Sequence, residues 1–348
     1  MRIGIIGAGH AGIEAAAAAH TAGADVVVFS DEPVAPYFRP RLVSVAMGQT
    51  APEEIALHPP AWYAARGIVL RRDCAVSALQ AADHAVTAGG ATERFDALVL
   101  ACGSQPVRPA FARAAAGLPV FNLWTQREAL DIRARVRPGA RLVVIGGGLL
   151  GVECALRAVA VGAVAILVEQ QPCLLPGLLS QGAAAALQQQ VSAAGVTVRT
   201  GCGVASLAAS AAGDIAATLD DGAILEADLV LVCIGAAPRL DLARAAGLAT
   251  ARGVLADTCL QVAPGVFVAG DAAQAGRPAQ GVVREAVAQG RLAGANAAAW
   301  AGGKTLQPFV PVPPQVSLRC GSVKVELARH ADDDATGERL RALRPDAG

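Results

Sequence analysis

The fold is decided by two stretches of the sequence, Gly7-Ala-Gly-His-Ala-Gly12 and Gly146-Gly-Gly-Leu-Leu-Gly151. Each follows a short β-branched run and opens an alanine-rich stretch, so a strand, a tight turn and a helix are expected in that order. In such a turn the first glycine permits the sharp bend, the second lets the backbone approach a pyrophosphate, and the third lets the helix pack closely on the strand. The sequence therefore predicts two dinucleotide-binding units.

The helix that each motif opens supplies the second part of the expected site. Free backbone N–H groups and the positive end of the helix dipole favour an anion at this point. The residues expected to bind at the two turns are Gly7, Gly9, His10, Ala11 and Gly12 in the first unit and Gly146, Gly148, Leu149, Leu150 and Gly151 in the second.

The motif also predicts an acidic residue about 20 residues further on, where the second strand ends and a ribose hydroxyl needs an acceptor. The first unit offers Asp31 and Glu32 after the strand at 26–29, and the second offers Glu169 after 164–168. A carboxylate at 169 repels a 2′-phosphate, and the next residues, Gln170 to Pro172, include no arginine. The second site is therefore expected to prefer NADH to NADPH.

Short β-branched runs alternate with alanine-rich stretches over most of the chain, which is typical of an α/β fold with parallel sheets. Together with the two motifs, this alternation predicts two Rossmann-like dinucleotide-binding domains. The expected strands lie at 3–6, 26–29, 97–101, 142–145, 164–168, 229–234 and 266–269.

Composition excludes several classes of function. The 348 residues carry 29 basic and 29 acidic side chains, and neither sign forms a long run, so a nucleic-acid partner is not expected. The eight cysteines form no Cys-x-x-Cys and no cluster at zinc spacing, which predicts reduced thiols, no metal site and a cytoplasmic location. The apolar stretch 142–168 contains Glu153 and Arg157, so no membrane span is expected there.

A third segment, Thr258 to Asp271 with its Val-Phe-Val-Ala-Gly-Asp ending, resembles the late segment of the FAD-dependent pyridine nucleotide-disulfide reductase superfamily. Residues 98–103 resemble the family's first crossover, with Cys102 in place of the usual threonine, and 229–235 its second. The resemblance covers about residues 1–305. It implies a two-domain flavoprotein like glutathione reductase, with an FAD-binding domain at 1–110 and 237–305, an NAD-binding domain at 111–236, and a shortened C-terminal interface segment at 306–348.

Within the superfamily, Tyr37 to Leu42 and Trp62-Tyr63 are most similar to NADH:rubredoxin reductases and to the FAD/NAD domain of assimilatory nitrite reductases. This likeness implies two catalytic residues, Arg39 beside the flavin and Glu153 reaching the nicotinamide. It also implies that Asp271 binds the ribityl chain and that the helix containing Arg284 points at the flavin pyrimidine ring. The remaining expected cofactor-binding residues are Val76, Ala101, Cys102, Gly103, Gly235 and Gly270.

Departures from the family pattern narrow the expected mechanism. No cysteine lies between residues 32 and 73, so a thiol relay from flavin to substrate is not expected. The lysine that many relatives carry after the Arg-Pro segment is absent, which removes the usual partner of Glu153. The segment 310–325 resembles the opening of the interface domain, and 330–348 is expected to be a frayed tail. The oligomeric state stays open.

The expected function is hydride transfer from NADH to FAD, followed by electron transfer to a rubredoxin-like one-electron protein, with the chemistry supplied by the cofactors. Three alternatives are kept. The acceptor could be dioxygen or a small quinone, as in an NADH oxidase. The chain could be the FAD/NAD part of a nitrite reductase, acting through a partner subunit. Alternatively, it could be a non-catalytic FAD-binding subunit.

Overall fold

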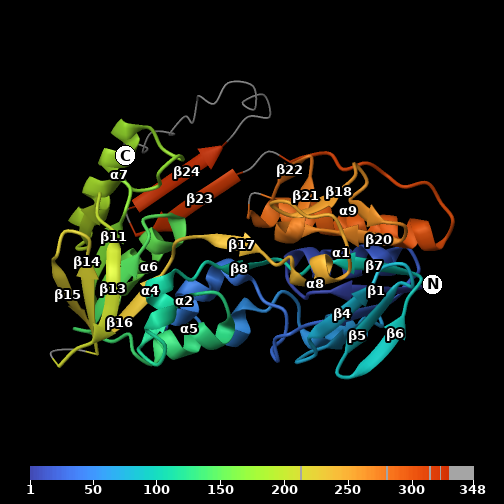
Figure 1. Cartoon of the computed structure of the whole chain (residues 1–348), viewed down its shortest axis with the longest axis horizontal. Coiled ribbons are helices and arrows are strands. Elements are labelled where there is room, and N and C mark those ends of the chain that lie inside the picture. Colours follow the sequence, from blue (N-terminus) through green and yellow to red (C-terminus); the bar gives the residue numbers. More distant parts are fainter. Residues whose placement is uncertain (212–213, 280, 313–314, 322, 329–348) are drawn as a thin grey trace. The chain divides into compact units, whose positions relative to one another are not determined.

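The computed structural model describes residues 1–211, 214–279, 281–312, 315–321 and 323–328 (Figure 1). Its internal contacts divide the chain into two compact units. The first unit contains residues 1–38, 56–105 and 237–314, and the second contains 39–55, 106–236 and the chain from 315 on. Two of the places where the chain passes from one unit to the other lie in β8 (Ser104–Pro106) and β17 (Ala236–Pro238).

The first unit is built on a six-stranded sheet in the order β19-β20-β7-β1-β2-β3. All neighbouring strands are parallel except β19 and β20. Its central strands read as continuous β-branched runs because both faces are covered. The bounds are β1 (Arg2–Ile6), β2 (Asp25–Phe29), β3 (Val69–Arg71), β7 (Ala97–Leu100), β19 (Gln261–Ala263) and β20 (Val266–Val268).

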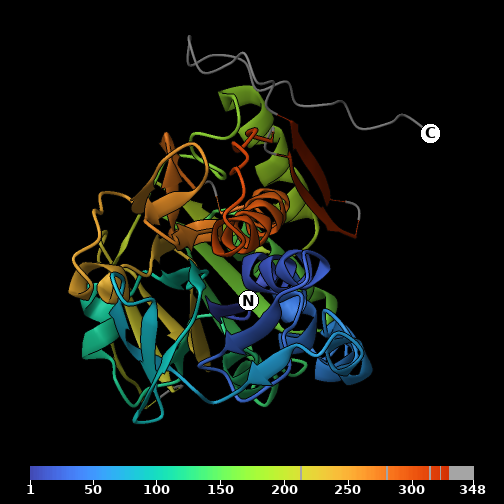
Figure 2. The same ribbon diagram turned by 90° about the vertical axis from the view of Figure 1, so that its right-hand side faces the viewer.

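Two long helices of this unit, α1 (His10–Thr21) and α9 (Val283–Ala301), pack against each other (Figure 2). Gly290 and Gly294 of α9 lie against the backbone of Ala11 and Ala15 of α1, so closely that a Cβ at either glycine would overlap a carbonyl oxygen. Glycine at these two positions therefore lets the backbones of α1 and α9 lie in direct contact.

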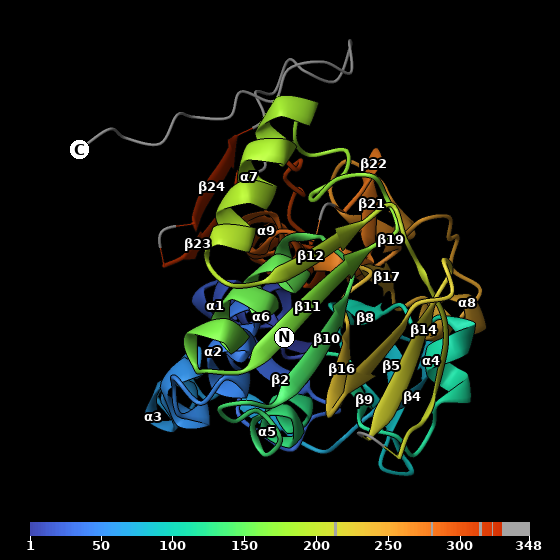
Figure 3. The ribbon, with the colours of Figure 1, turned by 90° about the vertical axis from the view of Figure 1, so that its left-hand side faces the viewer.

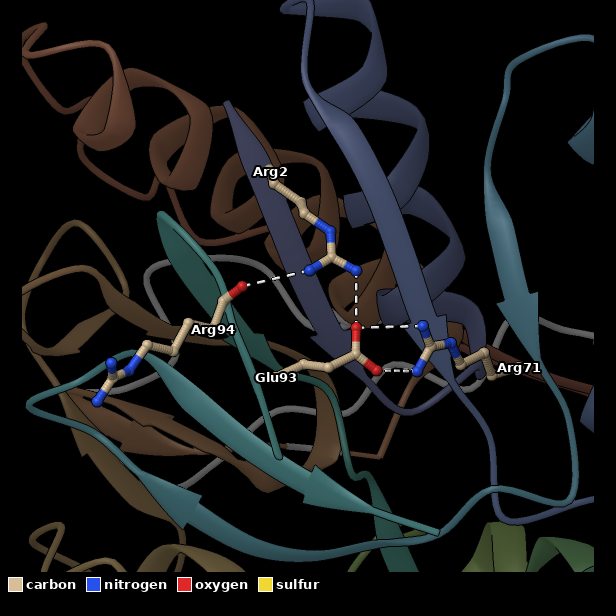
Figure 4. Close-up of polar contacts among 4 residues, drawn as sticks. All are labelled: Arg2, Arg71, Glu93 and Arg94. Carbon is tan, nitrogen blue, oxygen red and sulfur yellow. Dashed lines mark hydrogen bonds and ion pairs between the residues drawn. The ribbon is translucent and has the colours of Figure 1, made fainter. Parts of the chain in front are cut away.

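Two small sheets and two short helices complete the first unit. An antiparallel sheet consists of β4 (Val76–Gln80), β5 (Ala85–Ala88) and β6 (Ala91–Arg94). A mixed sheet consists of β18 (Val254–Ala256), β21 (Ala273–Ala275) and β22 (Arg277–Pro278), in which β18 and β21 are parallel and β21 and β22 antiparallel. The helices are α3 (Pro60–Ala64) and α8 (Asp241–Ala245). Glu93 of β6 accepts hydrogen bonds from Arg2 of β1 and Arg71 of β3, which ties the small sheet to the large one (Figure 4).

The second unit has a five-stranded parallel sheet in the order β12-β11-β10-β16-β9 (Figure 3). The bounds are β9 (Val120–Phe121), β10 (Arg141–Ile145), β11 (Val164–Glu169), β12 (Thr197–Thr200) and β16 (Leu229–Val232). Its helices are α2 (Leu42–Ala46), α4 (Ala110–Ala114), α5 (Gln126–Arg133), α6 (Leu149–Ala160) and α7 (Gln181–Ala193).

A three-stranded antiparallel meander and a hairpin add to this unit. The meander is β13 (Val204–Ala209), β14 (Ile215–Leu219) and β15 (Ile224–Ala227). The hairpin, β23 (Gln315–Cys320) and β24 (Val323–Ala328), contacts α6 and α7 and buries Leu318 and Val323. This hairpin is part of the interface segment expected at 306–348, whereas the tail expected at 330–348 lies outside the described residues.

The α/β fold class expected from the sequence is confirmed, since all seven expected runs are strands whose ends lie within two residues of expectation. The apolar stretch 142–168 forms β10, α6 and β11. Within the described ranges no helix is long and apolar enough to cross a membrane. Residues 39–55, which the sequence assigned to the first domain, belong to the second unit because the buried side chains of α2 pack on α5 and α6.

Candidate functional site

The two glycine turns have the same geometry in both units. Gly7 and Gly146 have φ of 109° and 110°, and their N–H groups donate to Phe29 and Val168 at 2.8 Å. A Cβ at either glycine would collide with the carbonyl of the neighbouring strand end, at Ala101 or Cys233 respectively. The third glycines, Gly12 and Gly151, lie equally close to the carbonyls of Gly7 and Gly146. Four of the six motif glycines are therefore required by the protein's own packing.

The middle glycines, Gly9 and Gly148, are different. Their φ values of −75° and −74° are open to any residue, and a Cβ at either would meet no atom within 4 Å. Each is the N-cap of its helix, and neither helix has a side-chain cap, so its first N–H groups face the same open space. An anion seated on these N–H groups explains why a side chain is absent here. The residues present fit a dinucleotide pyrophosphate in both units.

In the second unit the turn opens into a cavity of about 840 Å³ at the carboxyl ends of β10, β11 and β16. In parallel α/β sheets ligands bind at this edge. The lining includes Gly146, Gly148, Leu149, Leu150, Glu169, Cys233 and Gly235, all within the second unit. The volume is within the range of small-molecule and cofactor sites.

Glu169 ends β11 inside this cavity and is 8% exposed. Its carboxylate accepts hydrogen bonds from the backbone N–H of Gly147 at 2.6 Å and of Gln171 at 2.7 Å. These bonds fix the carboxylate next to the glycine turn. Each oxygen retains a lone pair for a ligand hydroxyl.

Glu153, expected to reach the nicotinamide, lies on the first turns of α6. Arg157, one turn further along, donates to Glu153 Oε1 at 2.7 Å and to Gln49 Oε1 at 2.6 Å. The sequence left Glu153 without its usual lysine partner, and the structure supplies an arginine from the same helix instead.

Arg39, the second expected catalytic residue, opens a short 3-10 turn in the second unit. Its guanidinium donates to the carbonyl oxygen of Trp124 and lies 5.9 Å from the centre of the Trp124 ring. Trp124 itself lines the cavity. No spacing along the chain indicates this pairing, because 85 residues separate the two side chains.

In the first unit, both expected acids lie at the carboxyl end of β2 and already have partners. Asp31 pairs with Arg239 at 2.7 Å, and Glu32 accepts a hydrogen bond from the Tyr37 hydroxyl at 2.7 Å. The Asp31 pair is exposed to solvent, whereas Glu32 is half-buried. Two carboxylates are thus held at the point where the motif needs a ribose acceptor.

Asp271 lies beside the first glycine turn. Gly270, with φ of 74°, donates its N–H to the buried Gln289 at 2.8 Å, and the Ser104 hydroxyl donates to Asp271 Oδ2 at 2.6 Å. Ser104 and Gln289 were not among the expected site residues. Both could have been predicted from the sequence, because Ser104 directly follows the crossover at 98–103 and Gln289 lies in the same helix as Arg284.

Cys102 of the same crossover is no candidate nucleophile. Burial raises the pKa of its thiol to about 11, against a smaller opposing effect of Arg239, so the thiol is protonated at neutral pH. All eight cysteines are free. Among the described residues, no group of histidine, cysteine and acidic side chains could hold a metal ion.

The remaining expected residues are spread over the two units. Gly103 (φ 68°) and Gly235 (φ 100°) follow the ends of β7 and β16 in turns that favour glycine. Arg284 is exposed in the first turn of α9, and Val76 opens β4.

Comparison with known proteins agrees with this geometry. The model of the pyridine nucleotide-disulphide oxidoreductase family matches residues 1–302. The chain belongs to this family. Membership confirms the resemblance found in the sequence, and with it an oxidoreductase whose cofactors are FAD and a pyridine nucleotide.

Two curated relatives and one solved structure illustrate what this chain is similar to. A probable ferredoxin reductase of Castellaniella defragrans is 34% identical over 78% of this chain and 67% of its own. The epsilon subunit of an NADH-dependent phenylglyoxylate dehydrogenase of Aromatoleum evansii is 32% identical over 88% of this chain and 75% of its own. A putidaredoxin reductase, crystallised as a covalent complex with putidaredoxin, matches with a TM-score of 0.86 and 27% identity, over 95% of this chain and 82% of that chain.

Proposed function

We propose that this chain is an FAD-dependent NADH reductase that delivers electrons to a small iron-sulfur electron-transfer protein. The observation that carries the proposal is the pair of matching cradles, each with an open middle glycine at an uncapped helix N-terminus. Two such cradles in one chain suit an enzyme that holds two dinucleotides at once.

The first unit is assigned to FAD and the second to NADH. Asp271, held by Ser104 and by the Gly270 turn, gives the first unit an acceptor for the ribityl hydroxyls. The second unit offers Glu169 at the ribose position, without an adjacent arginine to bind a 2′-phosphate. The proposed bounds are 1–110 and 237–305 for the FAD-binding domain and 111–236 for the NAD-binding domain, although residues 39–55 pack within the second unit.

The bound flavin would accept hydride from the nicotinamide and release electrons singly. The residues of the chain bind and orient the two cofactors. Leu149 and Leu150 on the first turn of α6 form an apolar part of the cavity wall, which excludes water. Arg157 holds the Glu153 carboxylate in one position on α6, and the family resemblance supports the proposal that this carboxylate reaches the nicotinamide.

The acceptor is inferred from the relatives. The relatives include a probable ferredoxin reductase and a putidaredoxin reductase, named for small electron-transfer proteins, and the chain spans 67% and 82% of their lengths. A ferredoxin or a rubredoxin-like protein is therefore the acceptor we favour. The similarity to a dehydrogenase subunit supports the alternative in which the acceptor is a partner subunit. The free cysteines favour a reducing compartment such as the cytoplasm.

An anaerobic titration with NADH tests this function. The purified protein is expected to be yellow, and about one equivalent of NADH should bleach its visible flavin bands. A colourless protein that fails to take up FAD, or bound flavin that NADH leaves unbleached, contradicts the proposal. Addition of ferredoxin or rubredoxin in a second step then distinguishes a diffusing acceptor from a partner subunit.

A further inference from the structure

Asp220, which has no role in the function proposed so far, lies in the same cavity as Glu169. It follows the last residue of β14, and its Oδ2 accepts a hydrogen bond from the backbone N–H of Gly203 at 3.1 Å. Both Asp220 and Gly203 line the cavity of about 840 Å³, as do Glu169 and Gln170. The meander thus brings a second carboxylate to this cavity.

Contacts around Gly203 show how close these groups are. A Cβ at Gly203 would touch the Asp220 carboxylate and would lie 3.6 Å from Cγ of Gln170. Gln170 directly follows Glu169, the expected ribose acceptor. Asp220, Gly203 and Gln170 therefore form one wall beside the position expected for the 2′-hydroxyl.

The acidic side chains at this end of the cavity, Glu169 and Asp220, have no basic side chain beside them on the described lining. Among the described lining residues of the cavity, the only side chains with a carboxyl, amino or guanidinium group are Glu169 and Asp220. Arg199 lies with Asp220 in an adjoining hollow, but its guanidinium pairs with Asp221 at 2.7 Å. On the described lining, a phosphate on the ribose 2′-oxygen would therefore meet two carboxylates and no cation.

We propose that Asp220 is a specificity-determining residue that, together with Glu169, makes the adenosine end of the cavity reject a 2′-phosphate. The substrate preference for NADH over NADPH is then set by two strands distant in sequence, β11 and β14. This inference rests on the proposed NADH site in the second unit.

The test measures binding of ADP-ribose and of 2′-phospho-ADP-ribose to the full-length flavoprotein by calorimetry. These probes differ only in the 2′-phosphate. Asp220→Asn retains an acceptor for Gly203 but loses the charge. It should raise the affinity for the phosphorylated probe about three- to tenfold and leave the affinity for ADP-ribose within about twofold, since one nearby charge is removed in a solvated site.

Asp214→Asn is the matched control, because Asp214 precedes β14 as Asp220 follows it and is likewise exposed to solvent. The charge change is the same at the opposite end of the strand, beyond the screening length of about 10 Å, so neither affinity should change. An equal loss of affinity for both probes, or an unchanged ratio, overturns the role of Asp220. If the wild-type protein binds neither probe, the NADH site itself is overturned, and the inference with it.

Discussion

Gly9 and Gly148 occupy the same place in the two units and are the residues at which the structure points most directly to a ligand. The protein does not need glycine there, because φ is ordinary and no atom lies within 4 Å of the position that an alanine Cβ would take. Their neighbours in the motif are needed for packing. This contrast separates binding glycines from folding glycines.

We expect Gly148→Ala to fold normally and to bind NADH at least about tenfold more weakly, because the methyl group occupies the space of the pyrophosphate. Flavin content should be unchanged. Gly9→Ala should do the reverse, lowering the flavin content of the purified protein while leaving ADP-ribose binding intact. Calorimetry and the visible spectrum measure the two effects. If each variant weakened both ligands, the assignment of one cofactor to each unit would be wrong.

At the scale of elements, the contact between α1 and α9 depends on glycine. A Cβ at Gly294 would overlap the carbonyl oxygen of Ala15, and neither backbone can move without separating the helices. Gly294→Ala should lower the free energy of unfolding by about 1 to 3 kcal/mol, as other overpacked sites do.

Gly182→Ala on α7 is the control for this substitution. Gly182 is the second residue of α7 and has no atom within 4 Å of its Cβ position, so alanine should stabilise the protein slightly, by up to about 0.5 kcal/mol. Chemical denaturation measures both changes. Equal effects of the two substitutions would contradict the proposed close helix contact.

The link between β1, β3 and β6 makes stability depend on pH. The hydrogen bond from Arg71, followed by the one from Arg2, lowers the pKa of Glu93 from its ordinary value of 4.5 (Figure 4). A carboxyl group whose pKa is lower in the folded state stabilises that state above its unfolded pKa, and this contribution is lost as the pH falls through the folded pKa.

Glu93→Gln should therefore lower the free energy of unfolding by about 1 kcal/mol at pH 7, with a diminishing difference from wild type below about pH 4.5. Asp83→Asn, which removes a largely exposed carboxylate next to the same small sheet, should change stability little at either pH. A pH-independent effect of Glu93→Gln would mean that the loss is one of packing and not of charge. Denaturation curves across this pH range measure it.

For the molecule as a whole, the cysteines indicate a mechanism without a redox-active disulfide. All eight are free, and Cys154 is a poor nucleophile, because a hydrogen bond with Cys233 and then burial raise the pKa of its thiol well above the ordinary value. The family name refers to disulfides, but this chain has no cysteine between residues 32 and 73, where the redox pair of such enzymes is expected.

NADH-dependent reduction of a one-electron acceptor should therefore survive treatment with iodoacetamide, whether or not NADH is added first. A redox disulfide would become alkylated only after reduction. Loss of activity confined to the sample that was pre-reduced with NADH would reveal a thiol relay. Activity assays with ferricyanide, before and after treatment, measure the outcome.

Local patterns in the sequence were enough to predict seven of the strands, the two glycine turns and the family, because these depend on spacing along the chain. A strand needs only a β-branched run, and a dinucleotide turn needs further glycines two and five residues after the first. Arg157 lies four residues after Glu153 on one helix, so this pair also follows from local spacing. Tertiary structure decided the rest of the site. Ser104 for Asp271 and Asp220 beside Glu169 are different, because these groups are far apart in the sequence and are brought together only by the packing of the strands. The packing of residues 39–55 in the second unit was also not predictable from the sequence, because it depends on which helices the buried side chains of α2 contact in the folded protein.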